Sequence, residues 1–552
     1  MPINSKNKFN VVLLEIRNNV TLYKFTLGLD YLTAVLRDKN YSAWDFMFES
    51  EDIETMKQKI LSVEPNIIGI SFYRETEETV FELTRAIKKV SPDIKIYLGG
   101  HTATLYAAQI LKKESTIDFI INGEGELTTL EVCKLLSNKE DLTTCKGVTY
   151  RKDKIIMRNE NREFIKSLDD LPFPALDTIK EKGITSNYIF AGISTSRGCL
   201  GKCGFCVANR YYKDSKNLGW RGRSPKSIVN EIKHIKNVFP NKRIFYTIVD
   251  SSIEDPCPKS KERLKEFVTL LEENNLFVPF NCFTRAESWS EDDSELIQRL
   301  KNVGLFEVSI GYESSNAKTL AIFNKRAAVE DNYRACRVFK KNNVNVFGFL
   351  IMFHPYTTLE ELRSNADLLI NVNMAYHPQS WWQTLDLWPD SRMFLGVAMD
   401  GLLIGPEEKG YLFKYAFEDG RVEKINEAMK LIQNSKSSLD YINTNEKIKL
   451  ECLLYNAWKV TDNSLTCVKQ EMDEYEDLYE KNKEYMSLRQ YELFMSLIKY
   501  VESGRDNSLI NQAVNDWIEL LKSNQIELEK MWMKFTMRLR RKNVDILGKG
   551  YK

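Results

Sequence analysis

The stretch SRGCLGKCGFCVANRYY, residues 196–212, gathers three cysteines, Cys199, Cys203 and Cys206, on one short glycine-containing segment. The chain has ten cysteines in 552 residues, and this is their one tight cluster. Cysteines spread so thinly do not suit a disulfide-stapled scaffold, and they indicate a reducing compartment. In that setting, closely spaced cysteines predict metal ligands or redox groups.

Three chemistries use cysteines at such spacing. A structural zinc site needs four ligands, commonly in two close pairs, and no second pair follows Cys203 and Cys206. A thioredoxin-like CxxC pair would leave Cys199 without a role. An iron–sulfur cube accounts for all three thiolates, because three of its irons are held and the fourth stays open for a substrate or cosubstrate. Glycines at positions 198, 201 and 204 allow the backbone to turn tightly around such a cube.

The cysteines follow the first of several strands that alternate with helices over residues 186–404. This alternation predicts about six βα units, and therefore a partial (β/α)6 barrel. In such barrels the chemistry gathers at the carboxyl ends of the strands, where the cysteine segment lies. The expected strands are YIFAGISTS (188–196), RIFYTIVD (243–250), FVPFNCFTR (277–285), FEVSIGYES (306–314), VNVFGFLIMF (344–353) and SWWQTLDLW (380–388).

Residues 1–150 alternate strand and helix at shorter spacing, which predicts a Rossmann-like α/β domain with a doubly wound parallel sheet. Its expected strands are FNVVLLEI (9–16), NIIGISFY (66–73), IKIYLGGH (94–101) and IDFIINGEGE (117–126). Ligands of such sheets bind beyond the carboxyl ends of the strands. The residues expected there are Ser71, Tyr73, Arg74, Gly99, Gly100, His101, Gly123, Glu124, Gly125 and Glu126.

The rest of the chain completes the predicted domain organisation. A hairpin-like segment and the proline-bearing LDDLPFPALDTI (168–179) indicate a linker over residues 151–185. Residues 405–552 are rich in Glu, Lys, Leu and Met, and they predict a mainly helical C-terminal domain. The fold class is therefore α/β, with a central barrel between an N-terminal sheet domain and a helical end.

Composition limits the partners. The 78 basic and 77 acidic residues give a net charge of +1, so a global basic field for nucleic acid is absent and nucleic acid is not expected as a partner. No apolar stretch approaches the length of a membrane span, and the first residues do not resemble a signal peptide. We therefore expect a cytoplasmic protein without a membrane partner.

The CxxxCxxC pattern with an aromatic residue before its last cysteine resembles the radical S-adenosylmethionine (SAM) superfamily. The resemblance implies that Cys199, Cys203 and Cys206 hold a [4Fe-4S] cluster whose open iron chelates the amino and carboxylate groups of SAM. It also implies that Phe205 lies near the adenine of SAM.

Further residues match this superfamily at the ends of later strands. GYES, residues 311–314, resembles the fourth-strand motif that contacts SAM, which assigns Glu313 to SAM binding. Arg285 ends the third expected strand, where an arginine can pair with a carboxylate, and Asp250 ends the second. LWPDSR, residues 387–392, resembles the sixth-strand motif of the superfamily but lacks its glycine.

The order of motifs over most of the chain resembles cobalamin-binding radical SAM enzymes: strand-GGH, strand-GEGE, linker, then CxxxCxxC. The resemblance implies that the first domain binds cobalamin. The segment EIRNNVTLYKFTLG, residues 15–28, has no histidine where base-replacing cobalamin domains carry one. This departure implies a cobalt without a histidine below it, and Arg74 lies where a loop could face the lower side of the corrin; a surface residue at a helix start is the alternative for Arg74.

The family implies a cobalamin-dependent radical SAM methyltransferase that moves a methyl group from SAM, through cobalamin, to a carbon of a peptide or natural product. Its partners would be a small-molecule or peptide substrate and an electron donor of the flavodoxin or ferredoxin type. The alternatives are a rearrangement or cyclisation with the same cofactors, polar methylation of an aromatic carbon, and a non-catalytic cobalamin-binding sensor.

Overall fold

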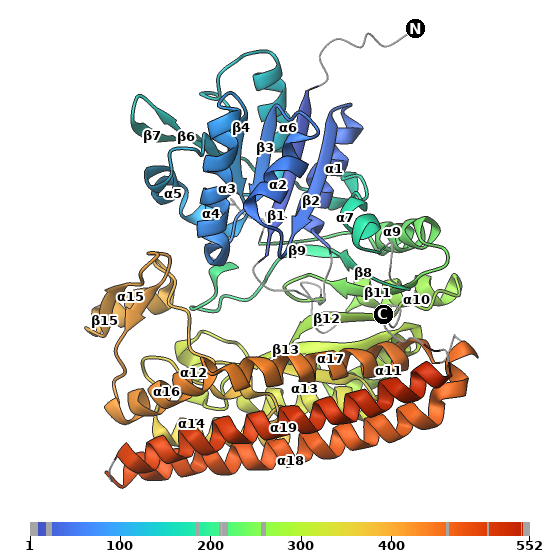
Figure 1. Cartoon of the computed structure of the whole chain (residues 1–552), viewed down its shortest axis with the longest axis vertical. Helices are drawn as coiled ribbons and strands as arrows, with labels where there is room; N and C mark the ends of the chain where they lie inside the picture. Colours follow the sequence, from blue (N-terminus) through green and yellow to red (C-terminus); the bar gives the residue numbers. More distant parts are fainter. Residues whose placement is uncertain are drawn as a thin grey trace. The chain divides into compact units, whose positions relative to one another are not determined.

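The computed structural model describes residues 9–17, 25–183, 187–208, 211, 219–254, 261–459, 463–504, 507–542 and 544 (Figure 1). The chain divides into two compact units. The first unit comprises Met1–Ile184, Ile189–Leu200 and Ala208–Pro240, and the second comprises Thr185–Tyr188, Gly201–Val207 and Asn241–Lys552.

The first unit is built on a seven-stranded sheet with the order β2-β1-β3-β4-β5-β6-β7. Strands β1 to β5 are parallel, and β6 and β7 add an antiparallel hairpin at one edge. The strands are β1 (Asn10–Ile16), β2 (Ser42–Phe48), β3 (Ile67–Ser71), β4 (Lys95–Gly99), β5 (Phe119–Ile121), β6 (Val148–Lys152) and β7 (Ile155–Arg158). Strand β1, NVVLLEI, lies between β2 and β3 and is buried along nearly its whole length, as expected for a parallel strand covered on both faces.

Helices connect the parallel strands of this sheet. They are α1 (Leu27–Asp38), α2 (Ile53–Leu61), α3 (Glu77–Val90), α4 (His101–Leu105), α5 (Ala107–Lys113) and α6 (Gly125–Ser137), with the short 3₁₀ helices η1 (Arg74–Thr76) and η2 (Leu168–Asp170). Helix α7 (Asp177–Gly183), strands β9 (Ser196–Gly198) and β10 (Trp220–Gly222), and helix α9 (Pro225–Val238) follow in the chain. Strand β2, SAWDFMF, is not predicted from the sequence because Asp45 interrupts its apolar run; this carboxylate is buried in the fold.

The second sheet has the strand order β14-β13-β12-β11-β8. Strands β11 to β14 are parallel, and helices follow them in the chain. The strands are β8 (Tyr188–Ile193), β11 (Arg243–Ile248), β12 (Phe280–Arg285), β13 (Leu305–Glu313) and β14 (Asn345–Leu350). Between β11 and β14 lie α10 (Glu262–Glu273), α11 (Ser294–Val303), α12 (Ala317–Ile322), α13 (Val329–Lys341), η3 (Ala286–Ser288) and η4 (Glu291–Asp293), and α14 (Leu359–Asn371) follows β14.

The sixth expected strand, SWWQTLDLW, does not form a full strand in the structure. Its start lies in the 3₁₀ helix η5 (Pro378–Trp381), and its later residues make only isolated bridges, from Thr384 to Phe353 and from Leu387 to Phe413. Trp381 and Trp382 are buried, so packing into the core, rather than sheet pairing, fixes this segment. The sheet therefore has five strands, one fewer than the sequence predicts.

Long helices form the end of the chain, as predicted (Figure 1). The elements are α15 (Arg392–Met399), β15 (Leu403–Pro406), β16 (Phe413–Tyr415), α16 (Gly420–Gln433), α17 (Lys436–Trp458), η6 (Asn463–Val468), α18 (Lys469–Glu502) and α19 (Asn507–Arg541). Helices α18 and α19 pack along each other, and the rings of Tyr475 and Phe535 stack between them with centroids 3.9 Å apart. The side-chain amide of Gln490 donates to the carbonyls of Ala375 and Tyr376 at 2.9 and 3.0 Å, which ties α18 to the segment after α14.

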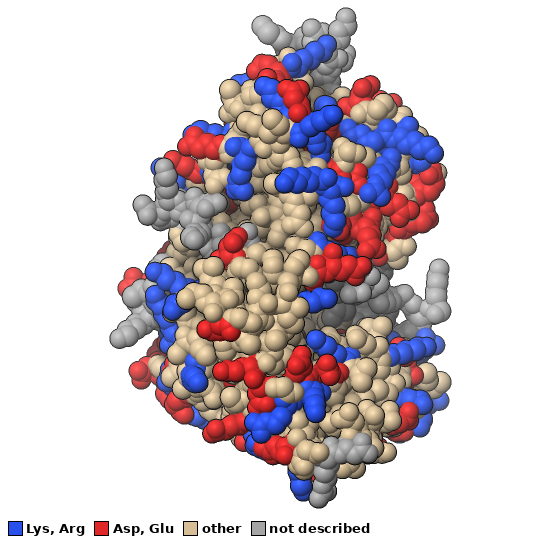
Figure 2. Space-filling model, turned by 90° about the vertical axis from the view of Figure 1, so that its left-hand side faces the viewer, with Lys and Arg blue, Asp and Glu red and all other residues tan. Residues whose placement is uncertain are grey.

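Among the described helices, none is long and apolar enough to span a membrane. On the face drawn in Figure 2, basic and acidic side chains are interspersed, in keeping with the net charge of +1.

Strands β9 and β10 form a separate two-stranded antiparallel ladder that carries the start of the cysteine segment. Gly198 closes β9 with a φ of +98°, and a Cβ atom at this position would lie 2.1 Å from the carbonyl oxygen of Gly219. Position 198 therefore accepts only glycine, both for its backbone conformation and for its contact with the partner strand.

We expect Gly198→Ala to lower the free energy of unfolding of the first unit by about 3 kcal/mol, because the methyl group clashes with backbone and the φ is strained. The control is Gly28→Ala in α1, where an added Cβ meets no atom within 4 Å. Urea denaturation followed by circular dichroism compares the two. Equal urea midpoints for the two variants would contradict the requirement for glycine at position 198.

Candidate active site

The CxxC turn of the cysteine segment is anchored by backbone hydrogen bonds. The N–H of Cys206 donates to the carbonyl of Cys203 at 3.2 Å, and the N–H of Gly204 donates to the carbonyl of Phe323 at 2.7 Å. The carbonyl of Gly204 accepts from the N–H of Met393 at 3.1 Å, and a Cβ at Gly204 would lie 3.3 Å from the side chain of Arg392. The turn is thus held between the end of α12 and the start of α15, with little room for a side chain at its glycine.

The three cysteines are half-buried, neither sealed in a core nor fully exposed. Burial raises the pKa of the Cys203 thiol to about 11, whereas the cations Lys325 and Arg285 act to lower it. Cations beside this cysteine favour the thiolate that an iron–sulfur cluster requires, so the donor set fits such a cluster. In the described part of the chain, no three or more His, Cys, Asp or Glu side chains converge closely enough to hold a single metal ion.

Glu313, the glutamate of GYES, ends β13 in a strained conformation. Its φ is +67°, which is uncommon for a residue with a side chain, and the pairing of β13 with β14 shifts register between Gly311 and Glu313. A Cβ at Gly311 would lie 2.4 Å from Glu313 Oε1, so the glycine leaves the space that the carboxylate occupies. Strain of this kind is typical of residues held for function.

Lys325 is the cation that faces Glu313, and the sequence analysis missed it. Its Nζ lies 3.4 Å from Glu313 Oε1, and its side chain is 5% exposed. Burial acts to lower the pKa of Lys325, but its acidic neighbours, Glu313 foremost, outweigh burial and raise the pKa above its usual value. Lys325 therefore stays charged, and its positive charge acts on both Glu313 of the GYES motif and Cys203 of the cysteine segment.

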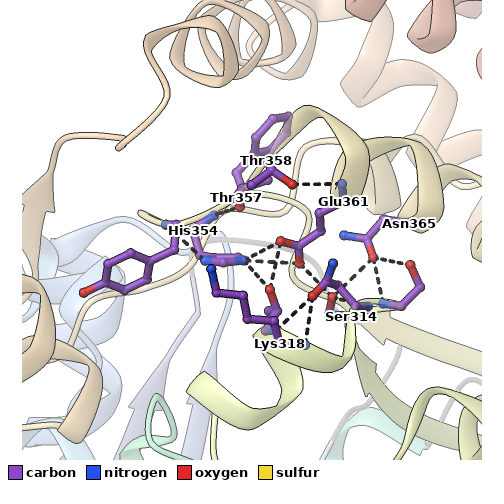
Figure 3. Close-up of polar contacts among 12 residues, drawn as sticks. Ser314, Lys318, His354, Thr357, Thr358, Glu361 and Asn365 are labelled. Carbon is purple, nitrogen blue, oxygen red and sulfur yellow. Dashed lines mark hydrogen bonds and ion pairs between the residues drawn. The ribbon is translucent and has the colours of Figure 1, made fainter.

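A buried polar network supports the loop after Glu313 (Figure 3). The carboxylate of Glu361, from α14, accepts from the hydroxyls of Ser314 at 2.7 Å and Thr319 at 2.8 Å. The Nε2 of His354 lies 3.2 Å from the same carboxylate, and the Oδ1 of Asn365 accepts from the backbone N–H of Ser315 at 2.8 Å. These hydrogen bonds, with Glu361 at their centre, fix the backbone that presents Glu313.

Arg285 ends β12 and is positioned by Glu254, which the sequence analysis also missed. The buried carboxylate of Glu254 accepts from the backbone N–H of Arg285 at 2.9 Å, from the indole of Trp289 at 3.2 Å and from the hydroxyl of Thr284. The guanidinium of Arg285 pairs with Glu287, with Nε 2.7 Å from Oε1. A buried acid without a motif has no sequence signature that separates it from an ordinary surface glutamate.

The other two residues predicted for SAM binding belong to the same unit as Arg285 and Glu313. Asp250 is 3% exposed and lies two residues after β11. Phe205 packs edge-on against Phe323, with ring centroids 5.0 Å apart, beside a cluster that includes Met393. Contact of these residues with SAM stays a prediction.

The carboxyl end of β4 has an open backbone. A Cβ at Gly99 would meet no atom within 4 Å, and Gly100 has a φ of +93° with only loose neighbours. The carbonyl of Gly100 accepts from the Thr104 hydroxyl at 2.8 Å, and that hydroxyl accepts from the N–H of Gly123 at 3.1 Å, which joins the loops after β4 and β5. No neighbouring protein atom requires a glycine at position 99. The open space there is therefore consistent with a cofactor that approaches the backbone at this edge of the sheet.

The other predicted cobalamin residues follow the same strand ends. Ser71 ends β3, and Tyr73, 43% exposed, donates its hydroxyl to Glu15 at 3.3 Å. Arg74 begins η1 and pairs with Glu75, with Nε 2.6 Å from Oε1, so a local carboxylate faces its charge. His101 begins α4, and Gly125 begins α6. Residues 18–24, inside the segment that lacks a histidine, lie outside the described residues.

Glu124 and Glu126 are engaged in buried ion pairs. Glu124 Oε1 lies 3.0 Å from Arg197 and 2.9 Å from Arg221, and Glu126 Oε1 lies 2.6 Å from Arg197. Burial acts to raise the pKa of Glu124, but Arg221 and Arg197 outweigh it and hold the pKa below its usual value. Both carboxylates are therefore partners of arginines in the first unit; their contact with cobalamin stays a prediction.

Comparisons with known proteins identify two domains in this chain. A family model described as the radical SAM superfamily matches residues 193–369, and one described as the B12 binding domain matches residues 16–132. An uncharacterized methyltransferase of Pyrococcus horikoshii is 22% identical over 352 residues, which cover 63% of this chain and 74% of that protein.

Two further relatives broaden this picture. An anaerobic magnesium-protoporphyrin IX monomethyl ester cyclase of Rubrivivax gelatinosus is 26% identical over 375 residues, 66% of this chain and 64% of that protein. The solved structure of the cobalamin-dependent S-adenosylmethionine radical enzyme OxsB, with aqua-cobalamin and S-adenosylmethionine bound, has a TM-score of 0.71 at 17% identity. This match covers 97% of the present chain and 81% of that one.

The chain is an enzyme that joins an N-terminal B12-binding domain to a radical SAM domain and a helical C-terminus. These two domains are the ones that the resemblance implied, and the predicted fold class is confirmed. Its cofactors are a [4Fe-4S] cluster, SAM and cobalamin.

We expect Gly99→Ala to weaken cobalamin binding at least about tenfold without destabilising the fold, because the methyl group meets no protein atom but would meet an approaching cofactor. Equilibrium dialysis with hydroxocobalamin measures the affinity. The control is Gly420→Ala, where an added Cβ also meets no atom within 4 Å. Unchanged affinity in Gly99→Ala would exclude this backbone as part of the cobalamin site.

Replacing Glu254 by Gln should lower the free energy of unfolding by about 2 kcal/mol. The amide of Gln replaces one accepting carboxylate oxygen by a donating NH₂ group, which would face the buried donors that Glu254 now accepts from. The matched control is Glu272→Gln, whose partner Arg299 lies in a more exposed pair worth less than about 1 kcal/mol. Thermal denaturation followed by circular dichroism compares the variants. Similar losses in both would show that Glu254 does not fix the end of β12.

Proposed function

We propose that this enzyme is a cobalamin-dependent radical SAM methyltransferase that transfers a methyl group to a carbon atom of its substrate. The observation that carries the proposal is the residue set around the cysteine segment: Cys203 beside Lys325, and Glu313 and Arg285 at the ends of neighbouring parallel strands. A B12-binding domain in the same chain, and a methyltransferase among its relatives, favour methyl transfer over other radical chemistry.

In this proposal Cys199, Cys203 and Cys206 hold the cluster, and Glu313 and Arg285 orient the polar groups of SAM. When bound, the cluster and SAM supply a radical that removes a hydrogen atom from the substrate, and cobalamin supplies the methyl group. The residues of the chain contribute positioning, since the reacting groups must be held in a fixed arrangement away from water. An electron donor of the flavodoxin or ferredoxin type would supply the single electron for each radical.

An apolar surface lies next to Arg285 and suggests the nature of the substrate. Phe283 lies two residues before Arg285, on the same face of β12, and its ring stacks against Phe349 of β14 with centroids 6.0 Å apart. Phe283, Phe349 and Val249 are 38%, 43% and 39% exposed, which is unusual for large apolar side chains at strand ends. We infer a substrate that presents an apolar carbon skeleton, in a small molecule or a peptide, to this face.

A ring-forming reaction is the second candidate. The relative from Rubrivivax gelatinosus is named a cyclase, and it matches this chain over both cofactor domains. A cyclisation would use the same radical step, but it would leave the methyl group of SAM out of the product.

The product decides between these reactions. The anaerobically reconstituted enzyme should hold about four irons per chain, and with methyl-deuterated SAM and an extract of the source organism it should form a product that carries the deuterated methyl group. A radical methyl transfer yields S-adenosylhomocysteine and 5′-deoxyadenosine in equal amounts. Methylated product without 5′-deoxyadenosine would indicate a polar transfer, and unlabelled product with 5′-deoxyadenosine would contradict methyl transfer.

The matched variants for this experiment are Cys203→Ala and Cys467→Ser. The first should lose most of the iron and all SAM cleavage, since it removes one cluster ligand. The second changes an exposed cysteine outside the segment and should leave both unchanged. Equal iron content in the two variants would overturn the cluster assignment.

A further inference from the structure

Two residues of the first unit that flank the cysteines, Arg197 and Tyr211, contact the segments that follow β5 and β4 at the carboxyl edge of the first sheet. Arg197, two residues before Cys199, reaches the carboxylates of the loop after β5. Tyr211, beyond the last cysteine, has its ring centroid 4.2 Å from that of His101, the first residue of α4, which follows β4. Arg197, Tyr211 and both loops belong to one compact unit, although the family models assign them to different domains.

Arg197 lies at the centre of the stronger of these contacts. Its guanidinium uses one terminal nitrogen for Glu124 and the other for Glu126, at 3.0 and 2.6 Å. Arg221 completes the group with two hydrogen bonds to Glu124, at 2.9 and 3.0 Å. The side chain of Arg197 is 17% exposed, and those of its partners are 9% or less. A guanidinium fork between two carboxylates fixes direction as well as charge, which a lysine cannot reproduce.

Continuous hydrogen bonds connect this arginine to the glycines of the cobalamin edge. The Thr104 hydroxyl joins Gly100 to the N–H of Gly123, the residue directly before Glu124. Gly123 has a φ of +75°, so the loop turns at this point and directs the next side chain toward Arg197. A cofactor that contacts Gly99 and Gly100 therefore lies at one end of a rigid path, and Arg197 lies at the other.

On its other side, Arg197 is connected to the first cysteine by β9. Arg197 pairs with Arg221 in the ladder of β9 and β10, and the N–H of Cys199 donates to the carbonyl of Gly219 at 3.0 Å, which extends that ladder. Gly198, between Arg197 and Cys199, is in close contact with the backbone of Gly219, so the backbone has little freedom to move at this point. Any shift of the loop after β5 is thus transmitted to the backbone of Cys199.

We propose that Arg197 is a positioning residue that couples cobalamin binding to formation of the iron–sulfur cluster. This inference rests on the proposed function only in taking Cys199 as a cluster ligand and the first sheet as the cobalamin site. Because coupling free energies are reciprocal, the cluster must raise cobalamin affinity by the same factor as cobalamin raises cluster affinity.

The test compares hydroxocobalamin affinity in iron-free and in cluster-reconstituted protein, by anaerobic equilibrium dialysis of the full chain. In the native protein the ratio of the two dissociation constants should be at least about fivefold. In Arg197→Gln the ratio should fall to one, while cluster and cobalamin still bind separately. In Arg197→Lys it should be intermediate, because a single ammonium keeps the charge but cannot bridge both carboxylates.

The control is Arg162→Gln. Arg162 pairs with Glu131, on the same helix α6 as Glu126, but it does not contact β9 in any described interaction. This variant should keep the native ratio. A native ratio of one, or an Arg197→Gln variant that keeps the native ratio, would overturn the inference. If Arg197→Gln does not fold, the Arg197→Lys ratio decides. A native protein that binds neither iron nor cobalamin would instead refute the proposed function, and this inference with it.

Discussion

The ion pairs of Glu124 and Glu126 with Arg197 and Arg221 are the interaction on which the arrangement of the first unit depends. Arg197 is separated from Glu124 by 73 positions in sequence, yet the two side chains meet with only 17% and 9% of their surfaces exposed. Removing one partner from such a group leaves an uncompensated buried charge, at a cost of about 3–5 kcal/mol. This constraint makes the hairpin that carries Cys199 part of the unit that contains the B12-binding domain.

In the second unit, buried carboxylates hold the ends of strands in position. Glu254 holds the backbone of Arg285 at the end of β12, and Glu361 holds the loop after Glu313 at the end of β13. Neither carboxylate belongs to the predicted cofactor contacts, but each fixes a residue that does. Because hydrogen bonds of this kind fix direction, they can keep strand ends in place before any cofactor is bound.

Local patterns in the sequence predicted most of the fold, and spacing predicted the cysteine segment. The parallel strands of both sheets were recognisable from apolar runs such as NVVLLEI, and the strand ends gave the candidate residues. The sequence could not predict β2, whose Asp45 is buried, or the collapse of SWWQTLDLW into the core, since tertiary packing decides both. The sequence also could not predict the roles of Lys325, Glu254 and Glu361. The partners of a buried charged residue are far away in sequence and become known only from the folded structure.

The proposed chemistry requires that the three cysteines hold a cluster with one iron left open for SAM. Electron nuclear double resonance of the reduced cluster, with SAM labelled by ¹⁷O in its carboxylate and ¹⁵N in its amino group, tests this claim most directly. Both labels should show hyperfine coupling to the cluster in the native protein. A reduced cluster in the presence of saturating SAM that couples to neither label would contradict it.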